Sequence, residues 1–173
     1  GAVDPLARLN RAVGARVESV SNQRFARAEN LVSPHEPVFD PGLFGRQGKV
    51  MDSWESVRHN PLGRDTLVLQ LAAPAAIDLV TVSTRFHLGN QAQAIEVEGW
   101  NDEVKAWQSI APRMALQGHA MHAVRAASGA KVFGRVRVAM FPDGGVTRLG
   151  LFGADLPEAD RARLLAEIGR AHV

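Results

Sequence analysis

The chain has 173 residues, of which 46% are hydrophobic and 22% are charged. These values suit a folded protein of one domain, or at most two small ones, and they argue against disorder, collagen and coiled coil. Cysteine is absent, which excludes disulfides, thiolate metal sites and cysteine nucleophiles. Because a reducing compartment fits this composition, and because no apolar run approaches the ~20 residues of a membrane span, we expect a cytoplasmic protein without a membrane partner.

The net charge is only +2, although the isoelectric point is about 9.7. Lys49, Lys105 and Lys131 are the only lysines among 20 basic residues, and the arginines that make up the rest stay charged at high pH. The isoelectric point is therefore no sign of nucleic-acid binding, and no basic cluster interleaves with aromatic residues. Arginine binds carboxylates bidentately, so the composition suits a small anionic partner.

The first half of the chain predicts few regular elements. A short helix is predicted over residues 5–13, because Asp4 can cap its start, a proline suits its first position and Gly14 would end it. A weakly alternating strand is predicted over residues 15–20. Residues 21–50 are rich in turn formers, and we expect a long ordered loop that carries function.

Short β-branched segments bounded by turn residues predict strands in the middle of the chain. They cover residues 66–71, 77–83, 94–100, 106–110, 132–140 and 146–152. Because no helices are interleaved, the pattern predicts an antiparallel β-sandwich. The sequence FPDGG at 141–145 predicts a hairpin turn between the last two strands. The sequence GHAMHAVRA at 118–126 does not settle between strand and helix.

The end of the chain predicts a helix over residues 157–168. Glu158 and Asp160 suit the positive N-terminal end of a helix, and a glycine follows the segment. The predicted organisation is a β-sandwich domain over residues 1–156 with a helical extension of the same domain over residues 157–173.

The sequence KVMDSWESVR at 49–58 is the first candidate functional segment. It places Asp52 and Glu55 on either side of Trp54. A carboxylate beside an indole can have a raised pKa and can serve as an acid or a base. A solvated edge strand with a tryptophan anchor explains the same pattern without chemistry.

Two further segments carry polar side chains next to glycines. In FHLGN at 86–90, glycine lets the backbone approach a ligand and the amide of Asn90 offers a donor and an acceptor. In FPDGGVTR at 141–148, Arg148 follows the turn and can bind an anion or pair with Asp143. Ordinary turns also explain both segments.

The six histidines are scattered along the chain. His119 and His122 are three residues apart, which lets them share a metal in a helix but places them on opposite faces of a strand. No spacing is diagnostic of a metal site, and no phosphate loop, dinucleotide fingerprint or Ser-His-Asp order is present. No cofactor is predicted, and a divalent metal ion is left open.

Taken together and in this order, the three segments resemble the allantoicase (allantoate amidinohydrolase) family. The family block M-D-G-W-E-[ST] reads MDSWES at 51–56, the block T-G-N reads LGN at 88–90, and the block Y-P-D-G-G-[VI]-x-R reads FPDGGVTR at 141–148. Upstream, SN at 21–22, FA at 25–26 and NL at 30–31 are similar to the family's S-N/D…F-A…N-L stretch, and VFDPG at 38–42 and GK at 48–49 match its lead-in. The resemblance runs from about Ala15 to Gly153.

The resemblance implies a galactose-binding-like jelly roll that hydrolyses allantoate, a small anion, to ureidoglycolate and urea in purine breakdown. Cutting this C–N bond needs a cation for the substrate carboxylate, a proton donor for the leaving nitrogen and a base. Catalytic roles are thereby predicted for Asp52, Glu55 and His122. Substrate-binding roles are predicted for Arg58, Asn90, Arg148 and Asp143.

Departures from the family pattern leave a second reading open. The family usually carries two repeats in tandem and this chain has one, so we expect a second homologous repeat or self-association. Ser83 stands where the family has Asp, Leu88 where it has Thr, and His122 is the only histidine of an S-H-H block. The alternative function is a catalytically inactive or divergent ligand-binding or assembly module, because the fold alone does not fix function.

Overall fold

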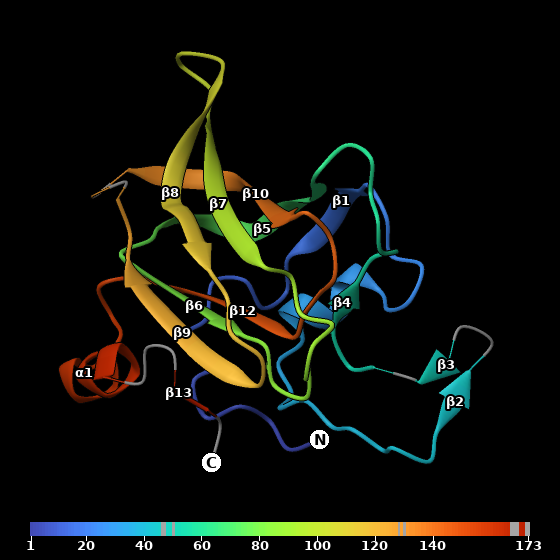
Figure 1. Ribbon diagram of the computed structural model, residues 1–173. Coiled ribbons are helices and arrows are strands. Elements are labelled where there is room, and N and C mark those ends of the chain that lie inside the picture. Colours follow the sequence, from blue (N-terminus) through green and yellow to red (C-terminus); the bar gives the residue numbers. More distant parts are fainter. Residues whose placement is uncertain (46–47, 50, 128, 130, 167–169, 172–173) are drawn as a thin grey trace.

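Two antiparallel sheets packed face to face form the body of the protein (Figure 1). The computed structural model describes residues 1–45, 48–49, 51–127, 129, 131–166 and 170–171. In spatial order, the larger sheet contains β1 (Arg16–Val20), β5 (Asp65–Ala76), β10 (Val132–Phe141), β7 (Ala94–Asn101) and β8 (Ala106–Ala115). The smaller sheet contains β12 (Arg148–Phe152), β6 (Leu79–Ser83), β9 (Ala120–Arg125) and β13 (Arg170–Ala171). The predicted antiparallel sandwich is confirmed.

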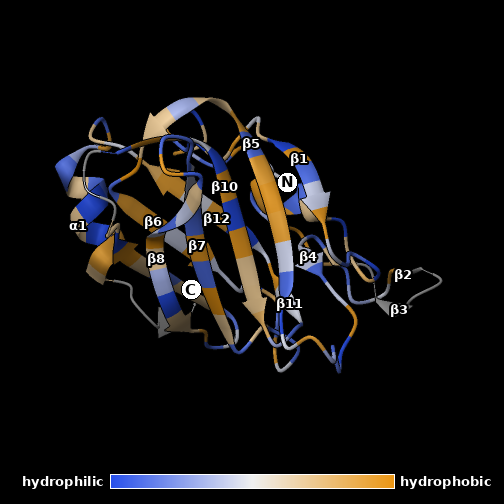
Figure 2. Ribbon diagram, turned by 90° about the horizontal axis from the view of Figure 1, so that it is seen from above, coloured by the Kyte–Doolittle hydropathy of each residue, from blue (hydrophilic) through white to orange (hydrophobic). Residues whose placement is uncertain are grey.

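Alternation of side chains along the strands builds the core between the sheets. In β5, Leu67 and Leu69 are fully buried and alternate with partly exposed neighbours. They share one hydrophobic cluster with Val80 and Val82 of β6 and with Leu149 of β12. Hydrophobic and hydrophilic residues also alternate along β7 and β10 (Figure 2). One face of each strand therefore turns toward the opposite sheet, as the period of two requires.

The predicted long loop over residues 21–50 contains regular pieces. It holds a 3₁₀ helix, η1 (Ala28–Val32), and two short paired strands, β2 (Phe44–Gly45) and β3 (Gly48–Lys49). The β2–β3 hairpin stands away from the sandwich in two views (Figures 1 and 2). Directly after it, β4 (Trp54–Glu55) pairs with β11 (Gly145–Val146) and so joins the first candidate segment to the last.

Helix α1 (Glu158–Ala166) covers the outer face of the smaller sheet. Leu164 packs with Leu79, Phe152 and Leu156 in a second hydrophobic cluster, and Arg161 pairs with Asp78 at 2.8 Å. The helix prediction is confirmed over these residues, whereas 167–169 lie outside the described part of the chain. Within that part, no helix combines the length and the apolar character of a membrane span.

The predicted helix over residues 5–13 is wrong, because this segment forms successive turns. The Oδ1 atom of Asn10 accepts hydrogen bonds from the backbone N–H groups of Ala12 at 2.9 Å and Leu151 at 3.0 Å. The backbone N–H of Arg11 also donates to the Leu151 carbonyl at 2.7 Å. Local hydrogen bonds also form within the segment, but these contacts with strand β12 hold it in successive turns and not in a regular helix.

The predicted hairpin turn at 141–145 is also wrong, because the turn connects the two sheets. Strand β10 before it pairs with β5 and β7, whereas β12 after it pairs with β6. The undecided segment 118–126 contains β9, which pairs with β6 over five residues and completes the smaller sheet. The residues of the turn at 141–145 determine that the chain bends there, but they do not determine which strand β12 pairs with.

Truncation of a core leucine tests the sandwich core. We expect Leu69→Ala to lower the free energy of unfolding by about 2–5 kcal/mol, because the side chain is fully buried and its loss leaves a cavity. The matched control is Leu62→Ala, whose side chain is 84% exposed, with an expected change within about 0.5 kcal/mol. Urea unfolding measures both values, and an equal effect of the two substitutions would contradict this core.

Candidate functional site

Glu55 lies where strand β4 meets the loops at one end of the sandwich. Its backbone pairs with Ala26 through two hydrogen bonds of 3.1 and 3.2 Å, and it lies opposite Gly145 in β11. The neighbouring Trp54 is fully buried in the core. Because successive strand residues point to opposite sides, Glu55 points away from the core. It is nevertheless only 9% exposed, so a carboxyl group is held in a confined place.

A chain of three side chains starts from this carboxyl group. The Nδ2 atom of Asn90 donates to Oε2 of Glu55 at 3.1 Å, and Oδ1 of Asn90 lies 2.9 Å from Nδ1 of His87. An amide oxygen only accepts hydrogen bonds, so the proton of the neutral His87 ring lies on Nδ1. The nitrogen and the oxygen of the Asn90 side-chain amide are thereby both hydrogen-bonded, which fixes the orientation of this side chain.

His87 is fully buried beneath this chain. Its Nε2 atom has no hydrogen-bond partner within the described part of the protein. The ring lies against Gly145, and a Cβ atom built on Gly145 would collide with the imidazole. Gly145, the second glycine of the FPDGG block, is therefore needed for close packing against His87. The Nε2 atom of His87 can accept a hydrogen bond.

Burial shifts the pKa values of both end groups in the direction that favours their uncharged forms. Desolvation raises the pKa of Glu55 above 4.5, and the Asn90 hydrogen bond and the Arg58 charge only partly oppose this shift. Desolvation also lowers the pKa of His87 below 6.5, against a smaller opposite effect of Asn90. A carboxyl group with a raised pKa keeps its proton to a higher pH than an ordinary glutamate does, and this is the direction that suits a general acid.

Three loops meet near Glu55 and bring further predicted residues close to it. Arg58 is exposed, and its Nη2 atom donates to the carbonyl of Gly89 at 2.9 Å. Asp143 accepts a hydrogen bond from the backbone N–H of Asn60 at 3.0 Å. These bonds tie the loops after β4, before Asn90 and after β10 to one another. The structure thus brings Glu55, Asn90 and Arg58 together, with Asp143 in the adjoining loop.

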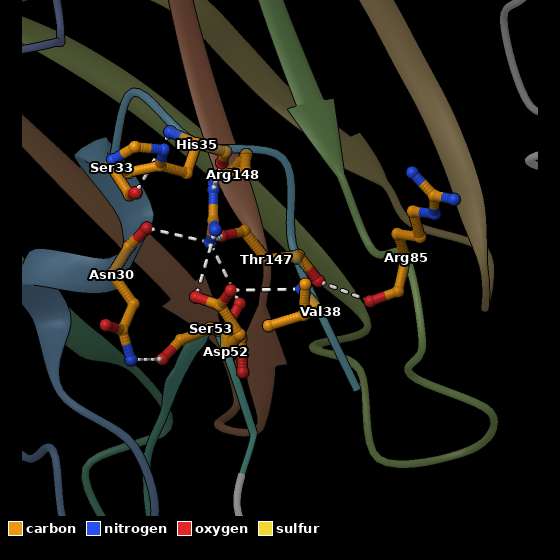
Figure 3. Close-up of polar contacts among 9 residues, drawn as sticks. All are labelled: Asn30, Ser33, His35, Val38, Asp52, Ser53, Arg85, Thr147 and Arg148. Carbon is orange, nitrogen blue, oxygen red and sulfur yellow. Dashed lines mark hydrogen bonds and ion pairs between the residues drawn. The ribbon is translucent and has the colours of Figure 1, made fainter. Parts of the chain in front are cut away.

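Asp52 and Arg148 form a separate network (Figure 3). Their side chains pair at 2.9 Å and are 25% and 13% exposed. Arg148 also donates to the carbonyl oxygens of Asn30, His35 and Asp52 at 2.8–2.9 Å, and Asp52 accepts from the backbone N–H of Val38 at 3.1 Å. The pair therefore braces the segments that lead into β4, and no described hydrogen bond joins it to Glu55.

His122 lies in the core side of strand β9. Its Nδ1 atom lies 3.0 Å from the carbonyl of Val82, and its Nε2 atom accepts from the backbone N–H of Gln117 at 3.0 Å. Burial lowers its pKa below 6.5. Both ring nitrogens are occupied by the backbone, and the described structure links His122 by no hydrogen bond to Glu55 or to Arg148. Among the described residues, no three His, Asp or Glu side chains gather as a metal-binding group.

Sequence reasoning did not select His87, although it named the segment that contains it. The available signal was its place three residues before Asn90. A buried histidine in a loop leaves no periodic pattern, so only the packing of Gly145 against its ring identifies it.

Loss of the Arg148 network is expected to destabilise the fold. Arg148→Met removes the partner of Asp52 and leaves several carbonyl groups without their donor, so we expect a loss of about 3 kcal/mol in the free energy of unfolding. Lys105→Met is the control, because its ion pair with Asp102 is exposed, and it should have no measurable effect. Equal stability of Arg148→Met and the native chain would contradict the bracing role.

The buried His87 is expected to make stability depend on pH. Below pH 6.5 the unfolded chain takes up a proton on this residue while the folded chain, with its lowered pKa, does not, so stability falls as the pH falls. His87→Gln should reduce the loss of unfolding free energy between pH 7.5 and pH 5, measured by denaturant titration at each pH. The exposed His59→Gln serves as the control. An unchanged slope in His87→Gln would count against a buried neutral ring.

Comparisons with known proteins identify related chains. The chain is 34% identical to a protein of Streptomyces coelicolor named "Probable allantoicase", over 83% of this chain and 44% of the relative. It is 35% identical to "Probable allantoicase 1" of Burkholderia mallei, over 87% and 45%. The crystal structure of allantoicase from Saccharomyces cerevisiae matches with a TM-score of 0.70 and 27% identity, over 87% of this chain and 48% of that one.

A family 32 carbohydrate-binding module from Streptococcus pneumoniae shares the fold alone, with a TM-score of 0.58 and 10% identity over 83% of this chain and 98% of the module. The predicted galactose-binding-like sandwich is thereby confirmed. The chain spans about half the length of the curated relatives it matches. The family model named allantoicase repeat matches residues 8–156, and the chain belongs to the allantoicase family.

Proposed function

We propose that this chain is a repeat of an allantoicase and takes part in the hydrolysis of allantoate to ureidoglycolate and urea. Membership of the family and the names of the relatives support this activity. Because the relatives are about twice as long, the proposal includes a second homologous repeat, on another chain or on the same one. We further propose a cytoplasmic location, for which the absence of cysteine is the supporting observation.

The reaction sets three chemical demands. Allantoate carries one carboxylate and two ureido groups on a central carbon, and one C–N bond of this carbon must break while a C–O bond to water forms. The leaving urea nitrogen needs a proton, the attacking water must lose one, and the substrate carboxylate needs a cation. One titratable group with a shifted pKa can serve both proton transfers in turn.

Glu55 fits the two proton transfers, and its burial is the observation that carries the proposal. In its protonated form, the carboxyl group donates to the leaving nitrogen of urea. The resulting carboxylate then accepts a proton from the water that adds to the central carbon, which returns Glu55 to its first state. The raised pKa supports this role, because it lets the protonated form persist at higher pH.

Asn90 and Arg58 complete the proposed site. Asn90 is a positioning residue, because its amide holds Oε2 of Glu55 while His87 holds the amide in turn. Arg58 is exposed and its positive charge acts on Glu55, so we assign it to the substrate carboxylate. The chemical roles predicted for Asp52, His122, Arg148 and Asp143 stay predictions.

Removal of the Glu55 acid tests the proposal. Glu55→Gln keeps the shape of the side chain and its contact with Asn90 but cannot transfer protons, so we expect urea release from allantoate to fall about 10²–10⁴-fold. The assay is run with and without added divalent metal, because no cofactor is assigned. Glu103→Gln, in the exposed turn between β7 and β8, is the control and should retain the native rate.

Two outcomes would contradict the proposal. Unchanged turnover in a folded Glu55→Gln variant would remove Glu55 from the chemistry. No urea from the native chain in either metal condition would show that this chain does not perform the reaction alone.

A further inference from the structure

A cavity lies on the outer face of the smaller sheet. Its volume is about 440 Å³, which is within the usual range for small-molecule sites. Thr81 and Ser83 of β6 line it, and both are nearly fully buried. They alternate with Val80 and Val82, which face the core, so their hydroxyl groups belong to the outward face of the strand. Glu55, Asn90 and His87 are not among the lining residues.

Arginines give this cavity a positive rim. Arg85, Arg148 and Arg163 line it, against the two carboxylates of Asp4 and Glu36. Arg148 is engaged with Asp52 and with backbone carbonyls, and Arg163 reaches Asp160 at 3.4 Å. The guanidinium groups of Arg148 and Arg163 therefore already have acceptors, in contrast to that of Arg85.

Arg85 carries a guanidinium group that has no acceptor within the described residues. The hydroxyl of Thr147 donates to the backbone carbonyl of Arg85 at 2.7 Å and holds its main chain (Figure 3). The guanidinium lies over the Phe86 ring at 5.1 Å, and no hydrogen bond or ion pair to it occurs in the described part of the chain. A half-buried cation beside a cavity, with all its donors available, is suited to an anionic ligand.

The other walls of the cavity are apolar. They are formed by Pro5, Leu6, Pro37, Met121, Phe152 and Leu164. A phosphate or sulfate ion would leave this surface unused, whereas an organic acid can bury a hydrocarbon part against it while its carboxylate meets the guanidinium fork.

We propose that this cavity binds a small organic carboxylate, with its charged group on Arg85 and its apolar part against Leu6, Phe152 and Leu164. The hydroxyl group of Thr81 supplies a further donor at the base of the cavity. The site is separate from Glu55, so the inference stands whether or not the chain hydrolyses allantoate.

The test compares benzoate with benzamide, which has the same shape without the charge, and with inorganic phosphate, which has charge without an apolar part. Isothermal titration calorimetry on the native chain should give a benzoate dissociation constant in the millimolar range or tighter, and benzamide and phosphate should bind at least about tenfold more weakly.

Variants locate the binding. Arg85→Gln should weaken benzoate binding at least about tenfold, because it removes the charge and the fork. Arg64→Gln is the matched control at an exposed arginine outside the cavity, and Glu55→Gln separates this site from the proposed catalytic one. Both should bind benzoate as the native chain does. Arg85→Lys keeps the charge without the fork, and its affinity should lie between those of the native chain and Arg85→Gln.

Circular dichroism and the thermal midpoint establish that each variant is folded. Absence of benzoate binding to the native chain would overturn the proposal, as would equal binding by folded Arg85→Gln or, if that variant does not fold, by Arg85→Lys. Phosphate binding as tight as that of benzoate would also overturn it, because the apolar walls would then contribute nothing.

Discussion

The burial of the Glu55 carboxyl group against the Asn90 amide is the interaction on which the functional account depends. In water a glutamate ionises well below neutral pH, and it is then a poor proton donor. Confinement to 9% exposure raises its pKa, while one amide hydrogen bond and the charge of Arg58 keep the group within a polar setting. The same packing directs the Glu55 side chain toward the loops. The position of the carboxyl group and its raised pKa therefore have the same cause.

The fold produces this confinement by bracing a two-residue strand from both sides. Trp54 is fully buried, and its Nε1 atom donates to the carbonyl of Asn22 at 2.9 Å, which anchors β4 in the core. The pair of Asp52 and Arg148 fixes the chain just before β4. Gly145 lies opposite Glu55 in the paired strand, and its lack of a side chain allows the His87 ring to pack against it. Core packing, an ion pair and a glycine contact thus determine where one carboxyl group points.

Strand alternation was enough to predict the sandwich and most of its strands, because alternate apolar residues must face a core whatever their partners are. The resemblance of the three blocks to the allantoicase family also implied that Glu55 and Asn90 belong to one site. Long-range contacts account for what could not be predicted. The side chain of Asn10 bonds to a residue 141 positions away and helps to hold residues 5–13 in turns where a helix was predicted, and the 141–145 turn connects the two sheets. His87 gave no pattern, and Asp52 lies three residues from Glu55 yet pairs in a different network.

The pKa of Glu55 is the quantity on which its proposed role as an acid depends. It can be followed as the chemical shift of the Glu55 side-chain carboxyl carbon in ¹³C NMR over a pH titration of the folded chain, with Glu55→Gln used to assign the resonance. The account predicts a midpoint above 4.5. A midpoint at or below that value would mean that burial does not hold a proton on this group, and it would remove the physical basis for its role as an acid.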